Sequence, residues 1–135
     1  MAGSIRWKAY RNSIRERLRL FILISIIIFP IHEMSHIIAQ VAFGVPVVIN
    51  VYWYGISTNE NISSVLAYDP AAFYIIVIAG LLGTLVAMPL LKKPLMGLFP
   101  GFEQRNGIML YYLVFLIAAF SIAAWDLVFL AMSIF

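Results

Sequence analysis

Cysteine is missing from this chain of 135 residues, and charged side chains are scarce. Without cysteine the chain can form neither a disulfide nor a thiolate–metal bond, so a metal ion would have to bind His, Asp or Glu. Charged residues make up 11% of the sequence and hydrophobic residues 64%, whereas about a quarter of the residues of a soluble domain are charged. A soluble chain of this length cannot bury so much apolar surface. The composition therefore predicts a membrane protein with one domain over residues 1–135.

Three segments are apolar and long enough to cross about 30 Å of hydrocarbon as helices. They cover approximately residues 18–43, 69–91 and 108–134. Pro70 lies at the start of the second segment, where a helix accepts proline in its first turn. We therefore predict an all-α membrane protein, with three transmembrane helices in a lipid bilayer.

The basic residues are concentrated on one side of the predicted spans. Six of the nine precede position 20, namely Arg6, Lys8, Arg11, Arg15, Arg17 and Arg19. Beside a long apolar run, such a cluster is more typical of a cytoplasmic flank than of a nucleic-acid site, so we expect no nucleic-acid partner. The other three lie within residues 92–105, and residues 44–68 contain none. The charges predict a cytoplasmic N-terminus and a C-terminus on the outer side.

Residues 46–58, after the first predicted span, are rich in β-branched and aromatic side chains, which favour strands. We predict a short β-strand or hairpin here, lying along the membrane interface. An exposed strand edge can bind an extended peptide as an additional strand. Val48, Asn50 and Val51 are therefore candidate substrate-binding residues.

Both histidines of the chain belong to one motif, His32-Glu33-Met34-Ser35-His36. Residues four apart share one face of a helix, so the two imidazoles can bind the same zinc ion. Glu33 lies beside the first of them, where it can act as general base toward a zinc-activated water. The alternative is a chance match, with the polar side chains joining helices. However, two His and a Glu within one span are energetically costly and generally mark function.

A catalytic zinc site usually has a third protein ligand and an open fourth position. Asp126 is the only acidic residue of the third predicted span. At 1.5 Å per helical residue, Asp126 and His32 lie about 21 and about 20 Å from the cytoplasmic boundary. The matching depths make Asp126 the predicted third ligand. Glu60 and Asp69 are weaker candidates because they lie in the connecting loop or at its edge.

Small residues recur every four positions in the second predicted span, at Ala79, Gly83 and Ala87. This spacing places them on one face of the helix. In lipid, such a face allows two helices to approach closely. We therefore predict that this face packs tightly against a neighbouring helix.

These features together resemble the site-2 protease family of intramembrane metalloproteases. The family's first core helix carries the motif matched here by His32, Glu33 and His36. A strand-containing segment like residues 46–58 follows it. The second core helix has a small-residue stretch similar to residues 79–83, and the third supplies an Asp ligand at the position of Asp126. The resemblance implies a divergent and minimal member that uses one zinc ion per chain to hydrolyse peptide bonds of membrane-spanning substrates.

The residues also leave two other functions open. One is a non-catalytic, zinc-binding subunit of a larger membrane complex, and the other is a component of a metal transporter. Glu33 favours the enzyme, because a structural zinc site needs no general base and is usually closed by four protein ligands. The single cluster of metal ligands and the three spans argue against the transporter.

Overall fold

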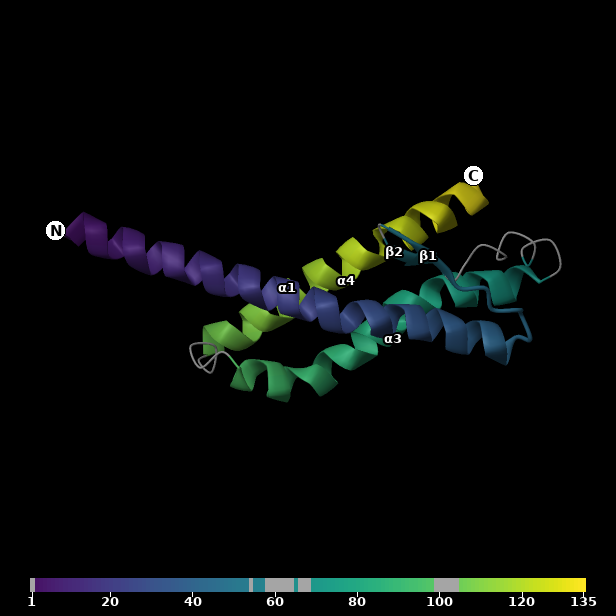
Figure 1. The fold of residues 1–135 in the computed structure, drawn as a ribbon, viewed down its shortest axis with the longest axis horizontal. Coiled ribbons are helices and arrows are strands. Elements are labelled where there is room, and N and C mark those ends of the chain that lie inside the picture. Colours follow the sequence, from purple (N-terminus) through teal and green to yellow (C-terminus); the bar gives the residue numbers. More distant parts are fainter. Residues whose placement is uncertain (1, 54, 58–64, 66–68, 99–104) are drawn as a thin grey trace.

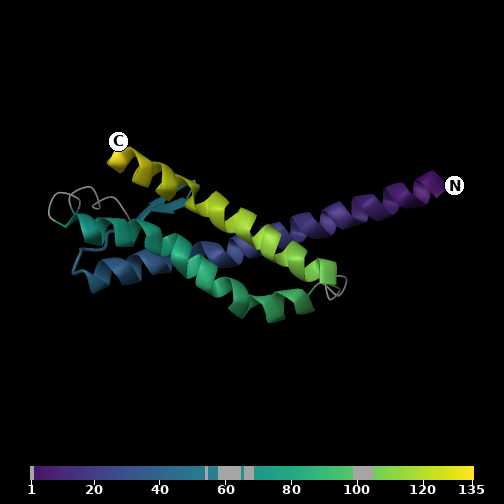
Figure 2. The ribbon, with the colours of Figure 1, turned by 180° about the vertical axis from the view of Figure 1, so that it is seen from behind.

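The computed structural model describes residues 2–53, 55–57, 65, 69–98 and 105–135 of the chain. The described elements are α1 (Ala2–Ala42), β1 (Asn50–Tyr52), β2 (Gly55–Ser57), α3 (Pro70–Gly97) and α4 (Arg105–Ile134). Figures 1 and 2 show that α1 and α4 run in the same direction and that α3 runs antiparallel to both. The three helices pack against one another in every pairwise combination. The predicted fold class, three long helices with a short β segment after the first, is confirmed.

Each helix contains a segment long and apolar enough to cross a membrane: Ser13–Ala42, Pro70–Gly97 and Gly107–Ile134. The fold is therefore that of a multi-pass membrane protein. α1 begins at Ala2, well before the apolar span predicted from residue 18, and its N-terminal end projects beyond the other helices (Figure 1). The reason is that arginine and lysine are good helix formers, which a boundary drawn from hydrophobicity does not detect. Pro30 lies within α1, which continues through it.

The sequence at each end of α3 explains where the helix begins and how it bends. Asp69 is the N-cap and its carboxylate accepts a hydrogen bond of 3.1 Å from the Ala72 amide, so this weaker candidate ligand has a structural role. Pro89 and Pro94 lie inside the helix, and each removes one backbone donor. Figure 1 shows α3 bent in this C-terminal part. The bent end carries the buried residues Leu95 and Met96 into the core.

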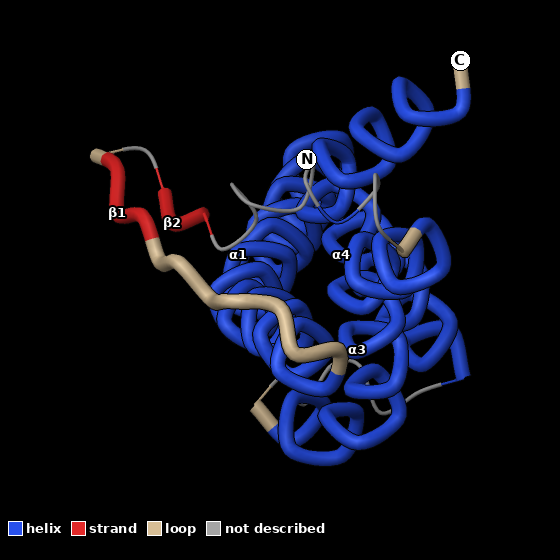
Figure 3. The backbone as a smooth tube through the Cα atoms, turned by 90° about the vertical axis from the view of Figure 1, so that its right-hand side faces the viewer, coloured by secondary structure: helices blue, strands red, loops and turns tan. Residues whose placement is uncertain are grey.

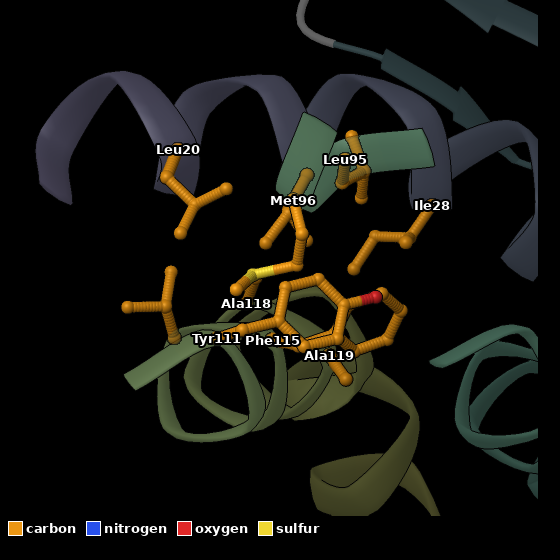
Figure 4. Packing of buried hydrophobic residues seen from close by; sticks show 10 residues of the cluster. Leu20, Ile28, Leu95, Met96, Tyr111, Phe115, Ala118 and Ala119 are labelled. Carbon is orange, nitrogen blue, oxygen red and sulfur yellow. The ribbon is translucent and has the colours of Figure 1, made fainter. Parts of the chain in front are cut away.

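The face that α1 turns toward the other helices has one buried residue every four positions. These residues are Leu20, Ile24, Ile28, His32, His36 and Gln40. The apolar half of this series packs with the bent end of α3 and with the buried aromatic rings of Tyr111 and Phe115 on α4 (Figure 4). Ala118 and Ala119, both fully buried, allow α4 to approach. This half of the bundle is a closely packed apolar core.

The β segment is a hairpin outside the three-helix bundle (Figure 3). Gly44, with a φ of 68°, ends α1, and the next amide, that of Val45, donates to the Gln40 carbonyl over 2.9 Å. The chain then reaches β1, in which Val51 pairs antiparallel with Ile56 of β2. Because β1 begins at Asn50, the candidate residue Val48 precedes the strand instead of belonging to it.

Candidate metal centre

His32 and His36 lie one turn apart on α1, with 2% and 0% of their surfaces exposed. Asp126 of α4 meets them in the bundle. Its Oδ2 atom lies 2.8 Å from Nε2 of His32 and 3.1 Å from Nε2 of His36, and the two Nε2 atoms are 3.1 Å apart. The three predicted ligands therefore come together in the bundle.

The size of this triangle can be compared with a zinc site. Zinc–nitrogen bonds of 2.0–2.1 Å place neighbouring ligand atoms of a tetrahedral site about 3.3 Å apart. The observed separations are 2.8–3.1 Å, so a shift of a few tenths of an ångström per ligand would fit the ion. One ligand atom from each of the three residues fits within 4.8 Å of the others. The dimensions and the donor set both suit a divalent metal such as zinc.

The hydrogen bond of His36 to α3 determines the tautomer of its ring, and therefore which ring nitrogen carries the lone pair. Nδ1 of His36 donates to the Ile76 carbonyl of α3 over 2.7 Å, and a carbonyl can only accept. In the neutral ring the Nε2 lone pair then points at the Asp126 carboxylate oxygen. These two acceptors, a buried nitrogen and the oxygen of a 16% exposed carboxylate, lie 3.1 Å apart. They repel each other unless a donor or a cation lies between them, which the Nε2–H of His32 or a metal ion could provide. A ligand histidine with its second nitrogen bonded to a carbonyl is the arrangement typical of metal sites.

The ring of His32 directs its polar contacts to the same point. Its Nε2 contacts both other residues, whereas Nδ1 is buried and has no hydrogen-bond partner among the described atoms. The two imidazoles meet edge to face, with centroids 4.7 Å apart and an angle of 82° between the planes. Both rings thus present Nε2 to Asp126, as two ligands of one ion would.

Glu33 and Ser35 lie on opposite flanks of the two histidines. Ser35 faces α3, because a side chain added at Gly83 would collide with its hydroxyl, which donates to the Ile31 carbonyl over 2.7 Å. Glu33 is two residues earlier, about 200° around the helix at 3.6 residues per turn. The half-buried Glu33 therefore lies on the flank of α1 turned away from α3.

Two contacts from α3 were not identified in the sequence. The contact of the Ile76 carbonyl could not be predicted from the sequence, because every residue carries a backbone carbonyl. Gly80 approaches both histidines, although the predicted packing face was that of Ala79, Gly83 and Ala87. Gly83 does contact α1, so the prediction that this face approaches another helix closely is correct. The contact with the histidines, however, is made by Gly80, which was not on the predicted face. The sequence did offer one indication of this contact. Gly80 lies three positions before Gly83, and either glycine could have been the one that faces the neighbouring helix.

The other candidate residues lie apart from these three predicted ligands or outside the described residues. Asn50 and Val51 belong to β1 and Val48 to the preceding loop, so the substrate-binding candidates lie on a separate element from the ligand-bearing helices. Glu60 falls outside the described residues. In the described part of the chain, the cluster of potential metal ligands is the one formed by His32, His36 and Asp126.

Comparisons with protein-family models, curated proteins and solved structures found no match to this chain.

Proposed function

We propose that this chain is an intramembrane zinc metalloprotease, a divergent member of the site-2 protease family, that hydrolyses peptide bonds of membrane-spanning proteins. One observation carries the proposal. A histidine whose lone pair is fixed by the Ile76 carbonyl faces a second histidine and a carboxylate inside an apolar bundle. These three side chains could hold a metal ion, and Glu33 adjoins them. The ligands His32, His36 and Asp126 would hold one zinc ion per chain and leave its fourth coordination position open.

Each residue of the site would have a defined task. A zinc ion bound there supplies Lewis-acid activation of water and of the peptide carbonyl. Glu33, on the flank of α1 away from α3, would accept the proton of the attacking water and deliver it to the leaving amine. The Ile76 carbonyl would keep His36 in the tautomer that binds metal. The apolar core around Phe115 would keep bulk water from the cytoplasmic half of the bundle.

A peptide must be unwound before it can be cut, and the hairpin offers a way to hold it extended. Val51 is 76% exposed and lies in β1, so the hairpin can accept an additional strand at an edge. We expect Val51→Pro to slow cleavage and to leave the zinc content unchanged, because proline removes a backbone donor at the edge. Equal cleavage by this variant and the wild type would exclude this role of Val51.

The charge distribution supports an orientation for the reaction. The exposed residues Arg15, Arg17 and Arg19 lie at the N-terminal end of the first span, and Lys92 and Lys93 lie near the end of α3. Basic residues are enriched on the cytoplasmic side of membrane proteins. We therefore infer a cytoplasmic N-terminus and an outward C-terminus. Cysteines introduced at either end, in a chain that has none, would report the orientation through their reaction with an impermeant thiol reagent.

Metal content tests the centre directly. We would measure zinc by mass spectrometry in the detergent-purified wild type and in His32→Ala and Asp126→Ala. Asp69→Ala is the matched control, because it removes a carboxylate that caps α3 and lies outside the cluster. We expect about one zinc ion per chain in the wild type and the control, and loss of zinc from both ligand variants. A metal-free wild type, prepared without chelators, would overturn the proposal.

The same preparations distinguish the enzyme from a non-catalytic subunit. Wild type reconstituted in liposomes would be incubated with a pool of transmembrane peptides, and the products identified by mass spectrometry. Cleavage by the wild type that is lost in the zinc-loaded Glu33→Gln variant supports the protease. A zinc-loaded wild type that cleaves nothing and purifies with other membrane proteins at fixed stoichiometry would favour the subunit instead.

A further inference from the structure

Helix α3 contributes no ligand side chain to the candidate centre, yet its backbone touches both histidines. The Ile76 carbonyl accepts the hydrogen bond from Nδ1 of His36. One turn later, a Cβ atom added at Gly80 would lie 2.6 Å from Cε1 and 2.7 Å from Nε2 of His32, and it would also collide with Nε2 of His36. Separations under 3.0 Å are essentially never seen for real Cβ atoms.

The space beside Gly80 is the space that a bound ion would need. A zinc ion lies about 2.0–2.1 Å from each ligand nitrogen. The Cβ position at Gly80 is within 2.7 Å of both Nε2 atoms, so a methyl group there would overlap the ion or its open coordination position. Glycine is the one residue that leaves this volume free.

We propose that α3 completes the metal centre with backbone alone: the Ile76 carbonyl orients His36, and the missing side chain of Gly80 provides the volume for the ion and its open coordination position. The proposal rests on the metal centre inferred above. It makes Gly80 a positioning residue whose replacement excludes metal although all three ligands are present.

The local structure of α3 fits this role. Ile76, Gly80 and Thr84 are spaced four apart and share one face of the helix. The buried hydroxyl of Thr84 donates to the Gly80 carbonyl over 2.8 Å, so it is satisfied within its own helix. Gly83, in the adjacent turn, meets Ser35 of α1. The two glycines therefore set the distance between the helices, and a longer distance would also stretch the bond from His36 to Ile76.

Gly80→Ala tests the proposal, and Gly97→Ala is its matched control. Gly97 lies on the same helix, and a Cβ atom there would meet nothing within 4 Å. The probe is zinc alone, titrated into the purified full-length chain. We expect Gly80→Ala to weaken zinc binding at least about 10–100-fold, the range found when the groups supporting metal ligands are altered. We expect Gly97→Ala to bind zinc as the wild type does.

Cobalt gives a readout that a purely structural role of Gly80 would not change. Tetrahedral Co²⁺ absorbs visible light strongly, and the band responds to ligand geometry. We expect this band in the wild type and in Gly97→Ala, and its loss or shift in folded Gly80→Ala protein. Zinc affinity and cobalt spectrum both equal to those of the wild type would overturn the role of Gly80 and leave the metal centre standing. A wild type that binds neither metal would overturn both proposals.

A double-mutant cycle covers the case in which Gly80→Ala folds poorly. The melting temperature would be measured without metal for Gly80→Ala alone and in a background with both His32→Ala and His36→Ala. Because the predicted collision is with the two imidazoles, we expect removing them to restore most of the lost stability. A loss of the same size in both backgrounds would show that the added methyl collides with another group, and the proposal would be wrong.

Discussion

The buried face of α1 has two halves with the same spacing and opposite chemistry. Leu20, Ile24 and Ile28 are followed at intervals of four by His32, His36 and Gln40, and all six are almost completely buried. The first three meet the large side chains of an apolar core, whereas the histidines meet a glycine and a short acidic residue. The spacing therefore determines which residues of α1 are buried, and the residues opposite determine whether they join an apolar core or a polar cluster.

The two halves also satisfy different physical requirements. In lipid, apolar side chains gain little from meeting one another beyond close packing, so Tyr111 and Phe115 stabilise the apolar half by filling it. In the polar half, a buried polar group without a partner costs several kcal/mol in hydrocarbon. His36 pairs both of its ring nitrogens, through Ile76 and Asp126, whereas Nδ1 of His32 has no partner among the described atoms. The two halves should therefore respond differently to substitution.

The largest effect should come from the polar half and should concern activity alone. Replacing Glu33 by Gln removes the proposed general base and changes the size of the side chain little. We expect peptide hydrolysis to fall about 10²–10⁴-fold, with zinc content and melting temperature close to those of the wild type. Rates of peptide cleavage and zinc content, measured on the same liposomes, check this. Hydrolysis at the wild-type rate would remove Glu33 from the mechanism.

A substitution in the apolar half should have the opposite profile. Phe115 is fully buried in the core, so Phe115→Ala leaves a cavity and should lower the free energy of unfolding by about 3–5 kcal/mol. Zinc content should stay at that of the wild type at temperatures where the variant is folded. Denaturant titration gives the free energy and mass spectrometry gives the metal. If this variant loses zinc while folded, the two halves are not independent.

Most of this comparison was visible in the sequence. The apolar runs predicted three helices, the motif spacing placed both histidines on one face, and the residue counts matched the depth of Asp126 to that of His32. Each of these follows from the fixed rise and rotation of a helix. These three predictions concern positions along a single helix, or along two helices that enter the membrane from the same side, and do not require the packing of the helices to be known.

The parts that were not visible depend on how the helices are rotated against each other. Gly80 and Gly83 are three residues apart, and the small-residue spacing alone selected the face of Gly83. Larger side chains on α3, such as Phe73 and Ile76, are buried in a hydrophobic cluster, and in the same rotation of the helix Gly80 lies against the histidines. The hydrogen bond from His36 to the Ile76 carbonyl could not be predicted for the same reason. A pattern within one helix does not specify which backbone group meets a neighbour.

Removing the metal should distinguish variants of the polar half from variants of the apolar half, because only the former lose a proposed ligand. A bound ion stabilises the folded state by about 2.7 kcal/mol when free zinc exceeds the dissociation constant a hundredfold. We expect this difference between zinc-loaded and chelated protein for the wild type and for Phe115→Ala. We expect none for His36→Ala. Thermal unfolding with and without a chelator measures it, and stabilisation of His36→Ala by zinc would place the ion elsewhere.

The smallest effect should come from a polar contact between α3 and α4 in the apolar half. The Tyr111 hydroxyl donates to the Met88 carbonyl over 2.7 Å and so ties α4 to α3 just before Pro89. Tyr111→Phe removes this bond and should lower the free energy of unfolding by about 1 kcal/mol, with zinc content unchanged. Tyr112→Phe, which keeps its ring beside Lys92, is the control and should have a smaller effect. A loss of zinc in Tyr111→Phe would mean that the bent end of α3 helps to position Gly80, and that the apolar half supports the site as well as the fold.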